Sequence, residues 1–507
     1  MPMPGLTTVL LAPRQNSSDA QDVRISEELG RHLVATRDFQ PGDAILTEEP
    51  LVFAPKATAD PEAFMPCVGC YKKVFTDMEE RCPDCGWPVC SGNCPGLKDP
   101  QHHGAECQIL SLRPECVLDD MADYYRHDAL LPLRCLLLQK TDPDKWSRLM
   151  EMQSHMECRT PGTESYDEAD EFIVQYLMNN FLNLLTTSEA KLDMKFIQNL
   201  SPELIHKICG IVDTNALEIR LGDGIELHAI YAKTSFMEHS CIPNTKHTFN
   251  VSNQGKNEFL KITIKAVVPI MKNNHVTTMY SHALWGTLAR RQHLKDTKYF
   301  SCKCERCSDP TELGTYLSAM KCLGDGNNPC DGIHLPEDPL DDETDWACNK
   351  CSVKVNNSQV SMIISQMGEE VENVQMMNPS VPILESLLPN LMSQEILDRK
   401  IKMCKDLIFV TKTLDPGNAR LSLYTAVLQH ELHSALVAKS KKTNVDGTFK
   451  SVTEVKELLS EAKIALDEAL SSLKDDVDES AGSKLHSVIK NSEKDFKDLC
   501  KKKDIYF

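Results

Sequence analysis

The sequence predicts an α+β protein in which short strands, cysteine-rich segments and helices alternate along the chain. Three observations carry this prediction. Apolar runs broken by turn residues favour short strands between Val23 and Phe53. Hydrophobic residues at helical spacing follow within residues 108–222 and again from about residue 385 to the end. Cysteines cluster in three segments, at residues 67–107, 302–307 and 322–351.

The first expected elements are short strands that follow a loose leader at residues 1–21. His32–Ala35 and Asp43–Leu46 are the apolar runs, and the turn pair Pro41-Gly42 separates them. A strand is expected again at Leu260–Val268, because apolar and polar residues alternate there. The alternation places three residues on one side of this strand, namely Ile262, Ile264 and Ala266.

Helices are expected between and after these strands. The capping-box pair Ser451 and Glu454 indicates that a helix begins there. A further helix is expected over Ser483–Lys501, and an earlier one should end at Asp415-Pro416-Gly417. Upstream of these, residues at helical spacing predict one buried face, made of Phe172, Ile173, Tyr176, Leu177, Phe181 and Leu184.

The C-terminal helices resemble a tetratricopeptide-like stack, although no clean repeat of about 34 residues is present. A helical domain that packs on the rest of the protein is the favoured interpretation, and an independent peptide-binding array is the alternative. The segment from His430 to His433 does not match the H-E-x-x-H zinc motif, because its second histidine comes one residue too early. We interpret this segment as helix surface.

The composition excludes several classes of protein. The 507 residues include 55 Lys and Arg and 74 Asp and Glu, which gives a net charge of −19. This charge opposes binding to phosphate backbones, so we expect a protein partner or substrate and no strong nucleic-acid binding. No run reaches the roughly 18 apolar residues of a membrane span. Residues 6–12 make a poor signal peptide because no basic region precedes them.

The 21 cysteines are too few for a disulfide scaffold and too closely spaced for scattered core thiols. In a reducing compartment such cysteines hold a metal more often than they form disulfides. We therefore expect at least three zinc ions and a place in the cytoplasm, the nucleus or both. A monomer is also expected.

The first cysteine set predicts two tetrahedral zinc sites. Gaps of two or three residues let both side chains of a pair reach one ion. So short a segment needs the metal for its folding free energy. His102 competes with His103 for one ligand position. The eight candidate ligands are Cys67, Cys70, Cys82, Cys85, Cys90, Cys94, His103 and Cys107.

The second set, Cys302, Cys304 and Cys307, supplies three thiolates and needs a distant fourth, for which Cys241 is the best candidate. A third set forms a further candidate zinc unit, from Cys322, Cys330, Cys348 and Cys351. The remaining cysteines are interpreted as buried thiols, and these are Cys116, Cys135, Cys158, Cys209, Cys404 and Cys500.

Residues 67–107, with four basic and six acidic side chains, resemble the MYND zinc finger, which implies contact with short proline-containing peptides. Together with Glu238–Asn244 and Thr287–Cys307, this segment resembles the SET and MYND domain-containing proteins. The extension at Cys322–Cys351 resembles their arthropod-type branch most. The resemblance implies a SET domain at 22–285 that is split by the finger and by a helical insert at 108–204. A post-SET zinc loop at 286–310, an extra zinc unit at 311–353 and a helical domain at 354–507 would follow.

The resemblance also implies an activity, namely S-adenosylmethionine-dependent methylation of lysine in histones or other proteins. A neutral lysine amine must attack the cofactor's methyl group, although a free lysine is almost wholly charged at neutral pH. Tyr280 stands where the family has its active-site tyrosine, and its hydroxyl suits the task of aligning the amine. The cofactor-binding positions that match are Gly30, Arg31, His32, Asn215, Glu238, His239, Tyr280 and Phe300.

Three residues depart from the family's pattern at this site. Glu238 stands in place of an asparagine, and an ionised carboxylate only accepts hydrogen bonds. His32 replaces the second glycine of a turn, and His275 stands where the family carries an acid. These departures give an alternative hypothesis, in which a SET scaffold with weakened turnover acts as an adaptor. Such an adaptor would regulate transcription through protein partners of its finger and helical tail.

Overall fold

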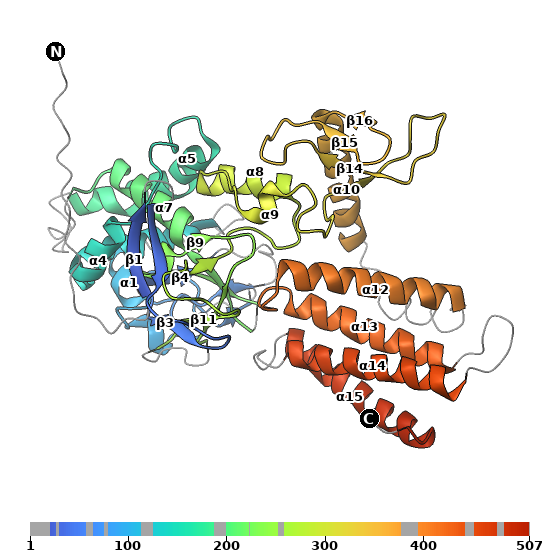
Figure 1. Cartoon of the computed structure of the whole chain (residues 1–507). Coiled ribbons are helices and arrows are strands. Elements are labelled where there is room, and N and C mark those ends of the chain that lie inside the picture. The colour runs from blue at the N-terminus through green and yellow to red at the C-terminus, as the bar shows by residue number, and fades with distance from the viewer. Residues whose placement is uncertain are drawn as a thin grey trace, which may run out of the picture.

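A computed structural model describes the chain in eleven stretches, at residues 21–26, 30–56, 64–75, 80–112, 125–186, 199–222, 224–251, 258–376, 394–441, 451–473 and 481–505. It shows a mixed body of helices and small sheets, with a helical domain beside it (Figure 1). The leader at 1–20, Cys116 and the start of the C-terminal helical region at 385–393 lie outside the described residues. No described helix is both long and apolar enough to cross a membrane.

Small sheets built from distant segments form the body. One sheet has the order β10-β11-β3, from Thr245–Phe249, Ile262–Ala266 and Ala44–Glu48. A second has the order β4-β8-β7, from Val52–Pro55, Glu226–Ile230 and Leu217–Arg220. β1 (Gln21–Ser26) and β2 (Gly30–Ala35) form a hairpin, and β9 (Glu238–His239) pairs in parallel with β12 (Thr277–Thr278). On β11, Ile262, Ile264 and Ala266 are buried and their neighbours are less so, which confirms the predicted alternation.

The finger at residues 67–107 is inserted after β4. β5 (Met65–Pro66) comes directly before the finger and pairs with β6 (Lys73–Val74) inside it. The finger also carries η1 (Pro95–Leu97), and it leads into α1 (Gly104–Leu110). The helical insert follows, with η2 (Tyr125–Ala129), α3 (Leu130–Thr141), α4 (Pro143–Met150), α5 (Glu164–Ala169) and α7 (Pro202–Asn215).

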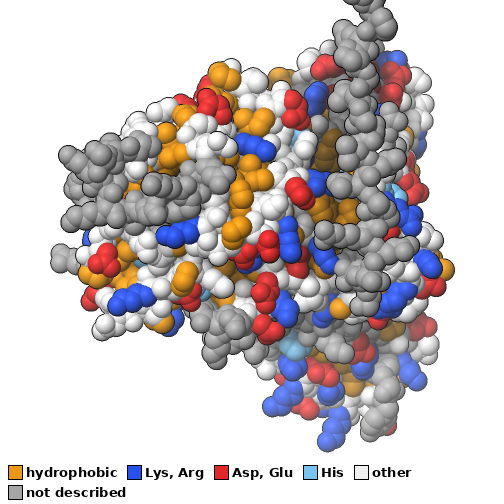
Figure 2. Space-filling model, turned by 90° about the vertical axis from the view of Figure 1, so that its left-hand side faces the viewer, with side chains coloured by type: hydrophobic (Ala, Val, Ile, Leu, Met, Phe, Trp, Pro, Cys, Tyr) orange, Lys and Arg blue, Asp and Glu red, His pale blue; other side chains and the backbone are white. Residues whose placement is uncertain are grey.

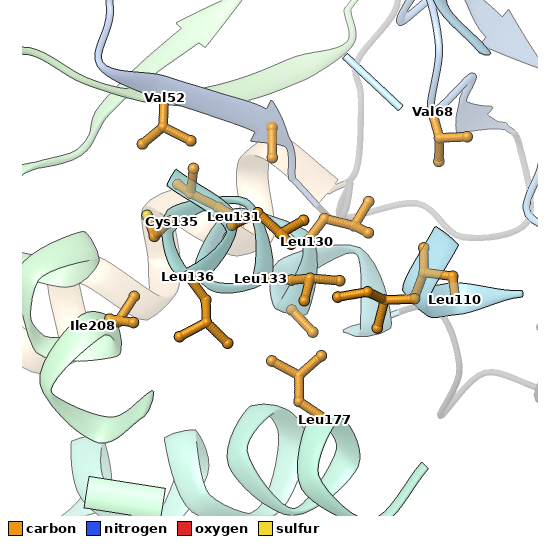
Figure 3. Close-up of a cluster of buried hydrophobic side chains, with 14 of the residues drawn as sticks. Val52, Val68, Leu110, Leu130, Leu131, Leu133, Cys135, Leu136, Leu177 and Ile208 are labelled. Carbon is orange, nitrogen blue, oxygen red and sulfur yellow. The ribbon is translucent and has the colours of Figure 1, made fainter. Parts of the chain in front are cut away.

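Helix α3 is the centre of the largest hydrophobic core. Its residues Leu130–Leu138 are all buried, as expected for a helix that is apolar on every side. Figure 3 shows its leucines between Val52 of β4, Leu177 and Ile208 of α7. The helix therefore joins the finger, the insert and the sheets into one body.

The predicted face at residues 172–184 is partly wrong. Tyr176, Leu177 and Phe181 are buried, but Phe172 is 44% exposed. The helix that continues α5 contains wider π-helical turns, in η3 (Asp170–Val174) and η4 (Met178–Leu182), on either side of α6 (Gln175–Leu177), and it ends in η5 (Asn183–Thr186). Each wide turn adds a residue, so the spacing of an ordinary α-helix no longer selects the buried face.

Helices α8 (Thr287–Lys298) and α9 (Glu305–Ser308) lead to a four-stranded sheet of β13 (Met320–Lys321), β14 (Ile333–Pro336), β15 (Trp346–Cys348) and β16 (Lys354–Val355). The helical domain then comprises α10 (Asn357–Met376), α12 (Gln394–Leu414), α13 (Ser422–Lys441), α14 (Val452–Ser472) and α15 (Ala481–Lys502).

Three C-terminal predictions are confirmed. Ser451 and Glu454 form both hydrogen bonds of a capping box. Helix α12 ends directly before Asp415, and α15 covers the expected helix over Ser483–Lys501.

The interpretation of the segment from His430 to His433 as helix surface is wrong for its second histidine. His433 is buried, its Nδ1 lies 2.8 Å from the carbonyl oxygen of Ala462 on α14, and its ring contacts Phe496 of α15. The tight contact of α13 with α14 and α15 covers this side chain. Among the remaining cysteines, Cys158 is exposed in the loop after α4, which corrects the prediction of a buried thiol, whereas Cys135, Cys209, Cys404 and Cys500 are buried.

The surface carries charge of both signs. Figure 2 shows acidic and basic side chains lying next to one another over much of the face it presents. On the described residues of this face, the acidic excess of the sequence is therefore not gathered into one patch.

Candidate metal centres and active site

The finger brings its eight ligands into two groups that alternate along the chain. One group is Cys67, Cys70, Cys90 and Cys94, and the other is Cys82, Cys85, His103 and Cys107. In each group the ligand atoms all lie within 4.8 Å of one another. The first pair of ligands therefore joins the third pair, and the second joins the fourth, a pairing that the spacing left open.

The distances within these groups fit a tetrahedral zinc ion. Zinc–sulfur bonds of about 2.3 Å place two thiolates of a tetrahedron about 3.8 Å apart. The Sγ atoms of Cys67 and Cys94 are 3.8 Å apart, and those of Cys82 and Cys107 are 3.6 Å apart. Both distances far exceed the roughly 2.05 Å of a disulfide. The donor set and its spacing thus fit zinc.

The second finger group resolves the choice between the neighbouring histidines. His103 Nε2 lies 3.2 Å from Cys85 Sγ, whereas His102 turns away and its Nδ1 lies 3.0 Å from the hydroxyl of Tyr71. His103 Nδ1 lies 2.9 Å from a carboxylate oxygen of Glu106, which is completely buried. A carboxylate behind a metal-binding histidine orients the ring and fixes its tautomer.

Arg134 connects this group to the rest of the body. Its guanidinium donates to both oxygens of Glu106, at 2.5 and 2.8 Å, and to the backbone oxygen of Phe53 on β4 at 2.8 Å. Burial alone would raise the pKa of Glu106, but Arg134 and His103 outweigh it and lower that pKa. Glu106 is therefore ionised, and it bonds both to His103 of the finger and to Arg134 of α3.

We expect Glu106→Gln to weaken zinc binding at this group about 10–100-fold, because the amide cannot carry the charge that orients His103. Competition with a calibrated chelator on the purified chain measures the loss. The matched control is Glu454→Gln, which changes an exposed capping residue far from the finger. A chelation curve for Glu106→Gln that superimposes on the native curve would contradict the role given to this carboxylate.

A third group joins Cys241 to Cys302, Cys304 and Cys307. Helix α8 separates these cysteines in sequence, and Cys241 follows β9. The Sγ atoms of Cys241 and Cys307 are 3.5 Å apart. This group therefore ties the chain after β9 to the loop after α8.

The charges around the third group also fit a thiolate-bound metal. Arg290 and Arg306 are fully buried, and both donate to the one carboxylate of Glu312, at 2.7 and 2.9 Å. Arg290 also donates to Cys307 Sγ at 3.4 Å. Two buried cations facing one carboxylate need further negative charge, and four thiolates on a divalent ion supply it.

The fourth group lies on the loops of the four-stranded sheet. Cys322 and Cys351 Sγ are 3.6 Å apart, and Cys330 and Cys348 Sγ are 3.7 Å apart. Backbone N–H groups point at three of these sulfurs, and a Cβ at Gly332 would lie only 2.5 Å from Cys348 Sγ. Backbone donors of this kind stabilise thiolates, so the third cysteine set also forms a candidate metal centre.

The candidate active site lies beside the third group, where β9 meets β12. The backbone N–H of Tyr280 donates to His239 Nδ1 at 2.9 Å. Nδ1 therefore lacks a proton, and Nε2–H donates to Cys241 Sγ at 3.2 Å. Burial lowers the pKa of His239 to about 4, so the ring is neutral at physiological pH. His239 thus connects Tyr280 to a candidate metal ligand.

The hydroxyl of Tyr280 donates to the backbone carbonyl of Met237. Burial, with a smaller contribution from the charge of Glu238, raises the pKa of Tyr280 to about 12. The hydroxyl is therefore protonated at neutral pH and can orient a neighbouring amine without taking its proton. Phe300 lies across His239, with ring centres 5.9 Å apart.

Asn215 is the last residue of α7, and Lys298 links the two residues before it to this site. Lys298 Nζ donates to the backbone oxygens of Asp213 and Thr214 at 3.0 and 2.9 Å, and it lies 6.0 Å from the ring centre of Tyr280. The side-chain N–H groups of Asn215 donate to the backbone oxygens of Gln153 and Ile211. Sequence reasoning missed Lys298, although its place directly before the Tyr299-Phe300 pair was a usable signal.

The three departures from the family pattern form one contiguous cluster. His275 Nδ1 makes a hydrogen bond to Glu238 Oε1, and the ring of His32 stacks on that of His275 at 4.8 Å. Glu238 Oε2 is buried and has no hydrogen-bond partner among the described residues. Gly30 begins this turn with a φ of +63°, and Arg31 donates to the backbone oxygen of Glu151 at 2.7 Å.

Comparison with known proteins agrees with this geometry. A family model for the SET domain matches residues 30–281. The fold and the site therefore define a SET-domain protein. Isoforms A and B of the Drosophila melanogaster SET domain-containing protein SmydA-8 are 30% and 31% identical over 325 and 350 residues, which cover 64% and 67% of this chain.

Two further relatives come from Arabidopsis thaliana and Dictyostelium discoideum. The Arabidopsis thaliana histone-lysine N-methyltransferase ASHR1 is 26% identical over 67% of the chain, and the match covers 65% of that protein. The Dictyostelium discoideum SET and MYND domain-containing protein DDB_G0273589 is 25% identical over 61% of the chain and 89% of its own length. The chain belongs to the family of SET and MYND domain-containing proteins. It spans 63% and 68% of the length of the two SmydA-8 isoforms.

Proposed function

We propose that this chain is a protein-lysine N-methyltransferase that uses S-adenosylmethionine and acts on histones or other proteins. The observation that carries the proposal is the placement of Tyr280. Its hydroxyl and backbone N–H are both held by the chain around β9, at the Met237 carbonyl and at His239. Support also comes from the relatives, one of which is named a histone-lysine N-methyltransferase.

Methyl transfer to lysine needs a neutral amine in line with the methyl group, and S-adenosylmethionine supplies that methyl as part of a sulfonium. With a pKa of about 12, Tyr280 keeps its proton and aligns the amine. Tyr280 therefore does not accept the proton that the lysine must lose. His239 cannot take the proton through Nδ1, because that atom already accepts the N–H of Tyr280.

The residues that would hold the cofactor surround this tyrosine. Glu238 Oε2, which is buried and has no hydrogen-bond partner in the described part of the chain, is an acceptor that suits an ammonium group, which S-adenosylmethionine carries. We assign the cofactor to the positions that match the family, namely Gly30, Arg31, His32, Asn215, Glu238, His239, Tyr280 and Phe300. We also propose that zinc occupies the four candidate metal centres and that the finger binds protein partners through short peptides.

Calorimetry with S-adenosylmethionine and transfer of a labelled methyl group to histones and other proteins test the proposal. We expect Tyr280→Phe to lower kcat about 100-fold or more, because the ring can no longer align the amine. Its affinity for the cofactor should stay within about threefold of the native value. If the native protein shows no heat of binding at millimolar S-adenosylmethionine and no methyl transfer, the proposed enzyme activity is refuted.

One observation favours a second candidate function, a non-catalytic adaptor. The cluster of Glu238, His275 and His32 places two imidazole rings at the expected cofactor turn. An adaptor would lose its protein partners on the double substitution of Cys67 and Cys70 to serine and keep them on Tyr280→Phe. Recovery of the partners with the opposite pattern would exclude it.

A further inference from the structure

The helical domain touches the active-site strands at the corner between two of its helices. The corner between α12 and α13, residues 415–421, faces the body of the protein (Figure 1). Asp415 shapes this corner, because its Oδ2 accepts the backbone N–H groups of Arg420 and Leu421 at 2.7 and 2.8 Å. These bonds use the backbone of Arg420, so its guanidinium is available for contacts outside the corner.

Arg420 makes two hydrogen bonds across the domain boundary. Its Nη1 donates to the backbone oxygen of Thr245 on β10 at 2.9 Å, and its Nη2 donates to the hydroxyl of Thr278 on β12 at 3.1 Å. Among the described residues, the guanidinium forms no ion pair. The planar guanidinium of Arg420 therefore fixes the distance between β10 and β12.

Two further contacts hold the corner in place. A Cβ at Gly417 would lie 2.4 Å from the side chain of Val267, so the backbone of the corner rests directly on the chain after β11. Leu414 and Leu421 are buried in a cluster with Ala283, against which Met279 and Ile242 pack. Met279 precedes Tyr280, so this apolar contact also reaches the candidate active site.

The strand that Arg420 holds is short, and its contacts with Asn244 and Thr245 are made at Thr277. The Thr277 N–H donates to Asn244 Oδ1 at 2.9 Å, and the Thr245 hydroxyl donates to the backbone oxygen of Thr277 at 2.7 Å. Arg420 adds a contact one residue further along, at Thr278.

β12 is two residues long, and within the described part of the chain its strand partner is the equally short β9, with Thr278 opposite His239. The backbone oxygen of Thr278 accepts the N–H of Ser240 at 2.8 Å. Tyr280 follows two residues later and takes its backbone position from this strand.

We propose that Arg420 is a positioning residue of the methyl-transfer site, which it serves from the helical domain. By clamping Thr245 and Thr278 it keeps β12 in register with β9, and it thereby holds the Tyr280 hydroxyl at the Met237 carbonyl. The proposal rests on the proposed function for its catalytic part, whereas its structural part can be measured without any activity.

Amide hydrogen exchange tests the structural part on the full chain. We expect Arg420→Ala to speed exchange of the amides from Thr278 to Tyr280 about tenfold, while exchange in the finger stays unchanged. Gly417→Ala, which pushes the corner away and keeps the arginine, should have the same local effect. Arg399→Ala removes an exposed arginine of α12 and should behave as the native chain.

Steady-state kinetics test the catalytic part. Arg420→Ala should lower kcat about tenfold or more and leave KM for the protein substrate within about twofold, since a shift of the aligning group affects the transition state most. Added methylguanidinium should restore part of kcat in Arg420→Ala and none in Gly417→Ala.

The outcomes separate the two ideas. Unchanged exchange in Arg420→Ala, or faster exchange throughout the body, would overturn the clamp. Faster local exchange with native kcat would overturn the positioning role. If the native chain transfers no methyl group, the proposed function fails, while the exchange result still decides whether Arg420 holds β12. Should Arg420→Ala fold poorly, Arg420→Lys and Gly417→Ala give the same readouts.

Discussion

Removal of zinc is expected to unfold the finger and the cysteine-bearing segments within residues 302–351, and to leave helices α12–α15 folded. The buried apolar residues of the finger belong to a core that it shares with α3, and its eight ligands form two groups that each fit one ion. Structural zinc contributes about 10–16 kcal/mol of apparent binding free energy per site. The C-terminal helices instead share an apolar core of their own, which includes Leu436, Leu466 and Phe496.

A strong chelator combined with a colorimetric zinc assay measures the release, and we expect four ions per chain. Amide exchange before and after chelation then locates the loss of structure. Residues 67–107 and 302–351 should lose protection, whereas α13 and α14 should keep it. Addition of zinc should reverse the change. One ion or none per chain, or a finger that stays protected after chelation, would refute the metal assignment.

Replacement of Glu312 by Gln is expected to lower the free energy of unfolding by about 3–5 kcal/mol, since it removes the carboxylate that faces two fully buried guanidiniums. Burial alone would raise the pKa of Glu312, but Arg290, Ser318 and Arg306 outweigh it and lower that pKa. The side chain is therefore charged in the folded protein. The amide keeps the shape of the carboxylate but turns N–H groups toward Arg290 and Arg306.

Urea unfolding followed by circular dichroism measures this change. Asp467→Asn is the matched control, because it breaks an exposed pair with Lys463 within one turn of α14 and should change stability by about 0.5 kcal/mol or less. We also expect Glu312→Gln to release zinc at a lower chelator concentration, since Arg290 contacts both Glu312 and Cys307. Equal urea midpoints for Glu312→Gln and Asp467→Asn would show that Arg290 and Arg306 need no carboxylate beside them.

Local patterns predicted local structure well. The alternation on β11, the capping box at Ser451 and the end of α12 depend on neighbours within a few residues, and all three are confirmed. Phe172 and His433 show where such patterns fail. Wide helical turns moved Phe172 outward, and packing between helices buried His433, and neither effect is encoded in the spacing of one helix.

The sequence by itself determined the chemistry of this protein. It specified which side chains are thiols and imidazoles, that they come in closely spaced pairs, and which tyrosine and histidine match the family's site. The chemical nature of each side chain and the number of residues between paired ligands are local properties, so the order of residues specifies them directly.

Only the tertiary structure decided how these parts meet. It interleaved the ligand pairs of the finger, joined Glu238, His275 and His32 into one cluster, and brought Arg420 from the helical domain to Thr278. Each of these contacts joins segments that are distant in sequence. Chain topology and packing set such contacts, and the order of residues along one segment does not reveal them.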